Sequence, residues 1–117
     1  MAKGTSITPA SLAEQIKADP HTLAYMAKAP VMWNKVLTPI MDEARKLAAG
    51  RRVAFEAQTF VDNLAGRRLE RLDFTVRLDA PLEDVVDFDS ALFNKFDYGK
   101  LHEQTKERLL PHTLPWR

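Results

Sequence analysis

Three histidines, His21, His102 and His112, are the side chains of this 117-residue chain best suited to acid–base or metal chemistry. None of them has a second ligand at the i, i+4 spacing that builds a metal site on a helix. Glu103 follows His102, but adjacent side chains on a helix point about 100° apart, which is a poor geometry for a proton relay. The chain has no cysteine, and its four dispersed glycines form no phosphate-binding loop. We therefore predict no catalytic residue, no metal, no cofactor and no enzymatic activity.

Carboxylates crowd one segment in the second half of the chain. They are Asp79, Glu83, Asp84, Asp87, Asp89 and Asp97. On the strand that we expect there, Asp87 and Asp89 share a face, and two carboxylates suit a hard cation. The segment lacks the central glycine and the regular spacing of calcium ligands that an EF-hand loop has, so we prefer the interpretation of a solvated acidic face.

Basic side chains outnumber acidic ones upstream, and the adjacent pairs Arg51-Arg52 and Arg67-Arg68 fall in expected loops. Identical copies with unlike-charged patches can attach head to tail, and a rotation that closes gives a ring. The residues predicted at this interface are Arg51, Arg52, Arg67, Arg68, Asp84, Asp87, Asp89, Leu114 and Trp116.

The same arginine pairs could bind DNA phosphates, which makes a small DNA-binding protein an alternative. With 17 basic against 16 acidic side chains, the chain has no basic surplus, and its acidic segment would repel a duplex. Non-specific contact with DNA that passes through a ring is the milder form of this hypothesis.

Prolines that follow residues able to cap a helix mark helix starts at Thr8-Pro9 and Asp19-Pro20. They predict short helices over residues 9–18 and 20–29, which need partners to be stable. The side chains expected to face inward are Leu12, Ile16, Leu23 and Met26.

Apolar residues then recur every three and four positions from Trp33 to Ala48, which predicts the main core helix. The stripe consists of Trp33, Val36, Leu37, Ile40, Met41, Ala44, Leu47 and Ala48. Pro39 interrupts it, so the chain either kinks or forms a short turn from Pro30 before a helix capped by Thr38. We prefer the second arrangement, with Gly50 after the helix end.

Alternating apolar residues predict two strands over residues 53–61 and 72–78. Residues 62–68 join them as a hairpin loop with Gly66 at its bend, although the length of this connection also permits a helical turn. Residues 82–88 read as a short third strand. Pro111 and Pro115 predict an extended C-terminal arm, since proline disfavours helix in the residue before it. This arm, which carries Leu114 and Trp116, lies on its own domain or on a neighbour.

The tract over residues 98–105 reads Tyr-Gly-Lys-Leu-His-Glu-Gln-Thr, and it places Tyr98, Leu101 and Thr105 on one side of a helical turn. We expect this closing element, formed by Tyr98, Leu101, His102 and Glu103, to dock at a sheet edge. The tract resembles the tyrosine-rich stretch of tail-completion or head-to-tail joining proteins of long-tailed bacteriophages, with Gln104 where that family has glycine. The likeness covers roughly residues 31–105.

The length and the 45% hydrophobic and 28% charged composition fit a single globular domain over residues 1–117. We expect an α+β fold, in which N-terminal helices and one long amphipathic helix pack on a small antiparallel sheet. Its parts would be a helical extension over 1–30, a core over 31–105 and an extended Pro-rich arm over 106–117. No segment reaches the roughly 20 apolar residues of a membrane helix, so we expect no membrane partner.

The resemblance implies a structural virion protein of the phage neck, assembled in the bacterial cytoplasm. It would form an oligomeric ring that joins the head connector to the tail, with its own copies, the connector and tail proteins as partners. A phage-encoded regulator that binds a host protein is a further alternative.

Overall fold

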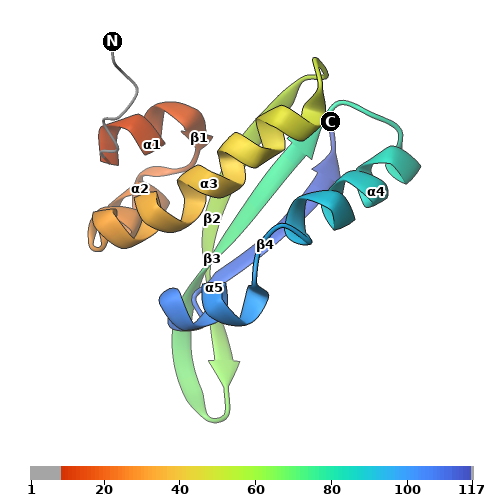
Figure 1. Ribbon diagram of the computed structural model, residues 1–117. Helices are drawn as coiled ribbons and strands as arrows, with labels where there is room; N and C mark the ends of the chain where they lie inside the picture. The colour runs from red at the N-terminus through yellow and green to blue at the C-terminus, as the bar shows by residue number, and fades with distance from the viewer. Residues whose placement is uncertain (1–8, 117) are drawn as a thin grey trace.

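The computed structural model describes residues 9–116, which form five helices and a four-stranded mixed sheet (Figure 1). The α+β class is therefore as expected. In chain order the elements are α1 (Pro9–Gln15), β1 (Ile16–Lys17), α2 (Pro20–Ala27), α3 (Pro30–Ala48), β2 (Val53–Leu64), β3 (Arg67–Leu78), α4 (Leu82–Phe93), α5 (Tyr98–Gln104) and β4 (Leu109–Pro115).

The sheet has the order β1-β2-β3-β4. Its centre is the antiparallel hairpin β2–β3, paired from Val53↔Leu78 to Leu64↔Arg67. The two outer strands run parallel to their neighbours, β1 to β2 and β4 to β3. The prediction of a purely antiparallel sheet is thus wrong at both edges. There, strands that are distant in sequence from their neighbours pair in parallel.

The hairpin strands are longer than the sequence pattern indicated. The expected loop over residues 62–68 shrinks to Ala65 and Gly66, whose φ angles are 50° and 80°. Positive φ at both positions is the pattern of a type I′ turn, whose twist matches that of the flanking strands. Gly66 lies at the bend as predicted, but Arg67 and Arg68 belong to β3 and not to a loop.

The two N-terminal helices pack as part of the core. α1 ends at Gln15, earlier than expected, because Ile16 and Lys17 pair with β2. Asp19 caps α2 as predicted, whereas the expected cap Thr8 lies outside the described residues. Of the side chains expected inward, Leu12, Ile16 and Met26 are buried and Leu23 is partly buried.

The helix α3 runs without a break from Pro30 to Ala48, so the expected start at Thr38 is wrong. Pro39 lies on its exposed face, where water can reach the Lys35 carbonyl that lacks a helix partner because proline has no N–H. Seven of the eight stripe residues are buried, and Leu47 is partly buried. The helix ends at Ala49, which has a left-handed φ of 51°.

The segment read as a third strand is the helix α4, which corrects the prediction for residues 82–88. Its buried residues Val85, Phe88 and Leu92 follow each other at spacings of three and four, the period of one helix face. Asp87 and Asp89 therefore do not share a strand face. Two positions apart on a helix, they point about 200° from each other.

The C-terminal segment is a strand of the sheet and not a separate arm. Residues Leu109–Pro115 pair with β3 from Leu72↔Leu109 to Leu78↔Pro115, so of the two alternatives it lies on its own domain. The Trp116 N–H donates to the Leu78 carbonyl, which indicates that the even-numbered residues of this segment direct their backbone N–H and C=O groups toward β3. Pro111 and Pro115 then lie where an N–H would face the free edge. They supply no donor there, which protects the edge from another strand.

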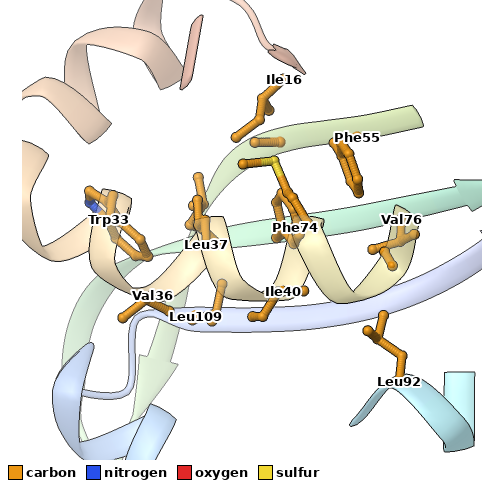
Figure 2. Packing of buried hydrophobic residues seen from close by; sticks show 14 of the residues in the cluster. Ile16, Trp33, Val36, Leu37, Ile40, Phe55, Phe74, Val76, Leu92 and Leu109 are labelled. Carbon is orange, nitrogen blue, oxygen red and sulfur yellow. The ribbon is translucent and has the colours of Figure 1, made fainter. Parts of the chain in front are cut away.

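One hydrophobic cluster joins all nine elements. Figure 2 shows its centre, where Trp33, Leu37 and Ile40 of α3 lie over the sheet. Phe55 and Phe74 stack there with ring centroids 6.0 Å apart. The helices cover one face of the sheet, and among residues 9–116 no element covers the other face (Figure 1).

Candidate interaction surfaces

The β2–β3 hairpin continues past the layer of helices and ends in an uncovered tip (Figure 1). We call residues 61–68 the hairpin tip. Val61 is 51% exposed, and Arg67 and Arg68 are exposed as well. The guanidinium group of neither arginine makes a hydrogen bond or an ion pair with another described residue. The tip therefore combines apolar surface with positive charge that nothing in the described chain neutralises.

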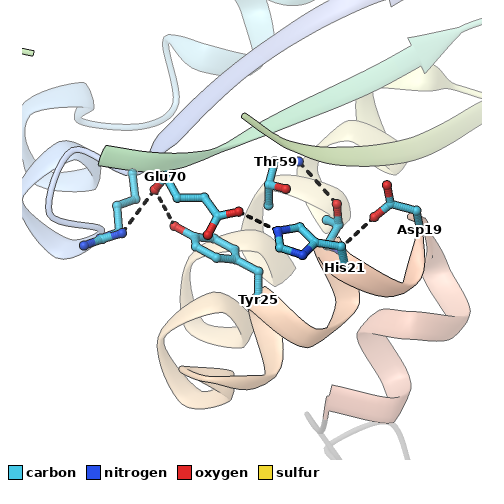
Figure 3. A network of polar contacts seen from close by, with 7 residues as sticks. Asp19, His21, Tyr25, Thr59 and Glu70 are labelled. Carbon is cyan, nitrogen blue, oxygen red and sulfur yellow. Dashed lines mark hydrogen bonds and ion pairs between the residues drawn. The ribbon is translucent and has the colours of Figure 1, made fainter. Parts of the chain in front are cut away.

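The root of the hairpin is held on its β3 side by the N-terminal helices (Figure 3). The Tyr25 hydroxyl donates to the Glu70 carbonyl at 2.8 Å, and Arg108 Nη1 donates to the same oxygen at 3.1 Å. The Glu70 carboxylate lies 2.6 Å from His21 Nε2. This hydrogen bond lowers the pKa of Glu70 below its ordinary value.

The β2 side of the root is held by the first turn of α2. Thr22 Oγ1 accepts a hydrogen bond from the Thr59 N–H at 3.2 Å, which satisfies a backbone donor at the strand edge. The Thr22 N–H in turn donates to the Asp19 carboxylate at 2.7 Å. The backbone N–H of Thr22, and then its hydroxyl, lower the pKa of Asp19.

A buried arginine ties the two strands to the segment before β4. Arg71 Nη1 lies 2.9 Å from Asp62 Oδ2 of β2, and Arg71 Nε donates to the Glu107 carbonyl at 2.8 Å. Arg71 is only 7% exposed, so its two partners compensate the cost of burying its charge. Together these contacts form a clamp, the residues Thr22, Tyr25, Glu70, Arg71 and Arg108, where the hairpin leaves the helices.

The predicted interface residues are divided by the structure into paired and free groups. Arg51 lies 3.1 Å from Asp84, and Arg52 lies 3.1 Å from Asp79, all within one chain. Arg52 also covers the ring of Trp116 at 4.8 Å, which adds a cation–π contact. These groups already have partners, so the positive charge that remains open for a neighbour is at Arg67 and Arg68.

A ridge of apolar side chains marks the outer side of α4. Leu82 is 66% exposed and Val86 57%, and Tyr98 at the start of α5 is 49% exposed. The Tyr98 ring contacts the buried Phe93 with centroids 5.6 Å apart, so Tyr98 lies against the C-terminal end of α4. Burial against Phe93, followed by the charge of Asp89, raises the pKa of Tyr98.

The closing element thus differs from its prediction. Tyr98 lies on α4 and not on the sheet, His102 and Glu103 are exposed, and Leu101 is buried in the core. The tract is held by its ends: Asp97 caps α5 through the Lys100 N–H, and the buried Thr105 hydroxyl donates to the Leu101 carbonyl at 2.8 Å.

The uncovered face of the sheet holds a shallow hollow of about 500 Å³. Polar side chains pair across strands in it: Arg77 lies 3.2 Å from Glu56, and His112 Nε2 lies 2.7 Å from Asp73 Oδ1. Leu114 lines the hollow and is exposed.

Two further findings concern the whole described chain. No helix in residues 9–116 has both the length and the apolar content that crossing a bilayer requires. In the same range, no three histidine or carboxylate side chains come close enough to hold a metal ion.

Comparison with protein families, with curated proteins and with solved structures finds no match for this chain. Its function is therefore inferred from its surfaces. Sequence reasoning missed the clamp, because its contacts join residues such as Tyr25 and Glu70 that are 45 positions apart.

Proposed function

We propose that this chain is a structural protein of the phage neck, which assembles into an oligomeric ring between the head connector and the tail. It would act without catalysis or cofactor, as part of the virion. The resemblance of residues 98–105 to tail-completion proteins supports this assignment. The structural observation that carries it is the clamped hairpin with its exposed, uncompensated tip.

A projecting hairpin suits assembly for a thermodynamic reason. Binding through a flexible loop costs the entropy of ordering that loop, whereas an element already held in place avoids much of this cost. The clamp fixes both strands at residues 59 and 70–71, directly before the tip. The tip can therefore reach a neighbouring subunit in one conformation.

The composition of the tip fits a protein partner better than a duplex. The tip carries Arg67 and Arg68 against Asp62, a net charge of only +1, and Val61 adds exposed apolar surface. A groove-binding ribbon needs a positive surplus to attract phosphates. Contact with DNA in the lumen of the ring remains a secondary, non-specific role in this proposal.

Size-exclusion chromatography with light scattering, combined with negative-stain electron microscopy, tests the proposal. We expect the mass to rise above the 13.3 kDa of one chain with increasing concentration and the images to show closed rings. A single-chain species whose DNA affinity falls steeply with salt would favour the DNA-binding alternative. A single-chain species with one stoichiometric host partner would favour the regulator. Either result would overturn the proposal.

A further inference from the structure

The ridge on α4 is an apolar surface without a cover in the described chain. Leu82, Val86 and Tyr98 are three of the six large apolar side chains that the described residues expose. Leu82 and Val86 are one helical turn apart, or roughly 6 Å along the axis. Tyr98 lies against the buried Phe93 at the end of α4. Apolar side chains scattered singly are ordinary on a surface, but neighbouring ones such as Leu82 and Val86 indicate a contact site.

The charge beside the ridge is negative and uncompensated. Glu83 and Asp87 are exposed on the same outer side of α4 and form no ion pair with any residue of the described range. Asp84, by contrast, is already neutralised by Arg51. A partner for the ridge should therefore present apolar surface together with positive charge.

The hairpin tip has the composition that the ridge requires. Val61 is exposed and Leu64 half-buried, and Arg67 and Arg68 supply two free positive charges. The tip of the same chain leaves Leu82 and Val86 exposed. The 12-residue strand β3 begins at Arg67, and α4 starts only after its far end, so roughly 35 Å separates the tip from Leu82 (Figure 1).

We propose that the hairpin tip of one copy binds the α4 ridge of the next copy. This inference rests on the proposed function and names the two surfaces that meet in the ring. Because the two surfaces are different patches of one chain, the contact is heterologous and passes from copy to copy until it closes. Pro111 and Pro115 at the β4 edge disfavour the competing edge-to-edge pairing of sheets.

Charge reversal and its rescue test the inference. We expect Arg67→Glu/Arg68→Glu to weaken assembly at least about tenfold, because it places like charges in the contact. Glu83→Arg/Asp87→Arg should do the same from the other side. The chain that carries all four substitutions restores opposite charges and should assemble within about threefold of the unmodified chain. The measurement is the mass from light scattering across a concentration series.

Matched controls separate this contact from general effects of charge. Lys35→Glu/Lys46→Glu on the exposed side of α3 makes the same change in net charge as Arg67→Glu/Arg68→Glu and should leave assembly unchanged. Circular dichroism melting checks that each variant is folded, since Glu83 also favours the start of α4. Leu82→Asn/Val86→Asn removes the apolar surface without altering charge and should also weaken assembly about tenfold.

The outcomes distinguish the inference from the function on which it rests. If the unmodified chain forms rings and the reversed variants do so equally well, the pairing of tip and ridge is wrong and the neck function stands. If both charge-reversed variants fail to assemble and the chain with all four substitutions also fails, the two surfaces do not meet each other. An unmodified chain that never assembles would overturn both proposals.

Discussion

The β2–β3 hairpin has two halves that share one hydrogen-bonded ladder and differ in what surrounds them. Between Val53↔Leu78 and Thr59↔Leu72, the helices cover one face and bury Phe55, Phe74 and Val76. Beyond the clamp, the strands continue through residues 61–68 without such cover. The comparison indicates a division of roles: the covered half stabilises the fold, and the uncovered half is available for contact with a neighbour.

The largest expected effect comes from breaking the covered half. Phe74 is fully buried and stacks on Phe55, so Phe74→Ala should lower the free energy of unfolding by about 3 to 5 kcal/mol. Val61→Ala in the tip should change it by no more than about 0.5 kcal/mol. Urea unfolding measures both. Similar losses from the two substitutions would remove the distinction between the halves.

The helix that covers the sheet should become more stable without its internal proline. Pro39→Ala restores a donor to the middle of α3 and relieves the clash of the ring with the preceding turn. We expect a gain of about 1 to 3 kcal/mol in the free energy of unfolding, with no change in amide exchange at the tip. A loss of stability in urea titrations would show that Pro39 has a packing role.

The clamp marks the boundary between the halves, and Tyr25→Phe removes one of its hydrogen bonds. We expect a loss of about 1 kcal/mol and faster amide exchange over residues 61–70, because the Glu70 carbonyl loses the Tyr25 donor. Tyr98→Phe makes the same chemical change on the α4 ridge and serves as the control. Equal exchange in both variants would argue against the clamp.

Acid should weaken the clamp through Glu70. The folded-state pKa of Glu70 lies below its ordinary value of 4.5, so its stabilisation is present above that pH and is lost as the pH falls through the folded-state pKa. For this partly exposed pair we expect roughly 0.5 kcal/mol or less. Glu70→Gln should be less stable than the unmodified chain at pH 7, and the difference should shrink as the pH falls below 4.5. A difference that persists in acid would contradict this.

The smallest effect is expected at the turn itself. Ala65 has a φ of 50°, which asparagine tolerates better than alanine does, and Asn-Gly is the preferred pair for this kind of turn. Ala65→Asn should raise the free energy of unfolding by a few tenths of a kcal/mol. Slower exchange of the tip amides, with no change in the covered half, would be the corresponding signal. Faster exchange there would contradict the turn assignment.

Much of the covered half could be predicted from local patterns. The three-and-four spacing from Trp33 to Ala48 and the alternation around Phe55 and Phe74 both appear in the sequence, because one side of each element faces the core. The strand prediction for residues 82–88 is wrong because a short run of mixed apolar and acidic residues fits a strand as well as a helix. The buried positions that decide the matter, Leu92 and Phe93, lie beyond that run.

The edges and the clamp could not be predicted in the same way. The prolines of β4 indicated extended backbone, but its parallel pairing with β3 depends on residues 37 positions apart, such as Leu72 and Leu109. The clamp joins Tyr25 to Glu70 across 45 positions, and its Arg71 bonds to Glu107 across 36. Likewise, the sequence showed that arginines and acids were segregated, but it could not show that Arg51 and Arg52 find their acids within the same chain.

Hydrogen exchange of the tip amides across a concentration series tests most directly whether the hairpin tip is the assembly element. We predict rapid exchange over residues 61–68 in the single chain, and exchange at least about tenfold slower at concentrations where light scattering shows a higher mass. A higher mass with tip amides that still exchange rapidly would contradict the account, as would a mass of 13.3 kDa at every concentration.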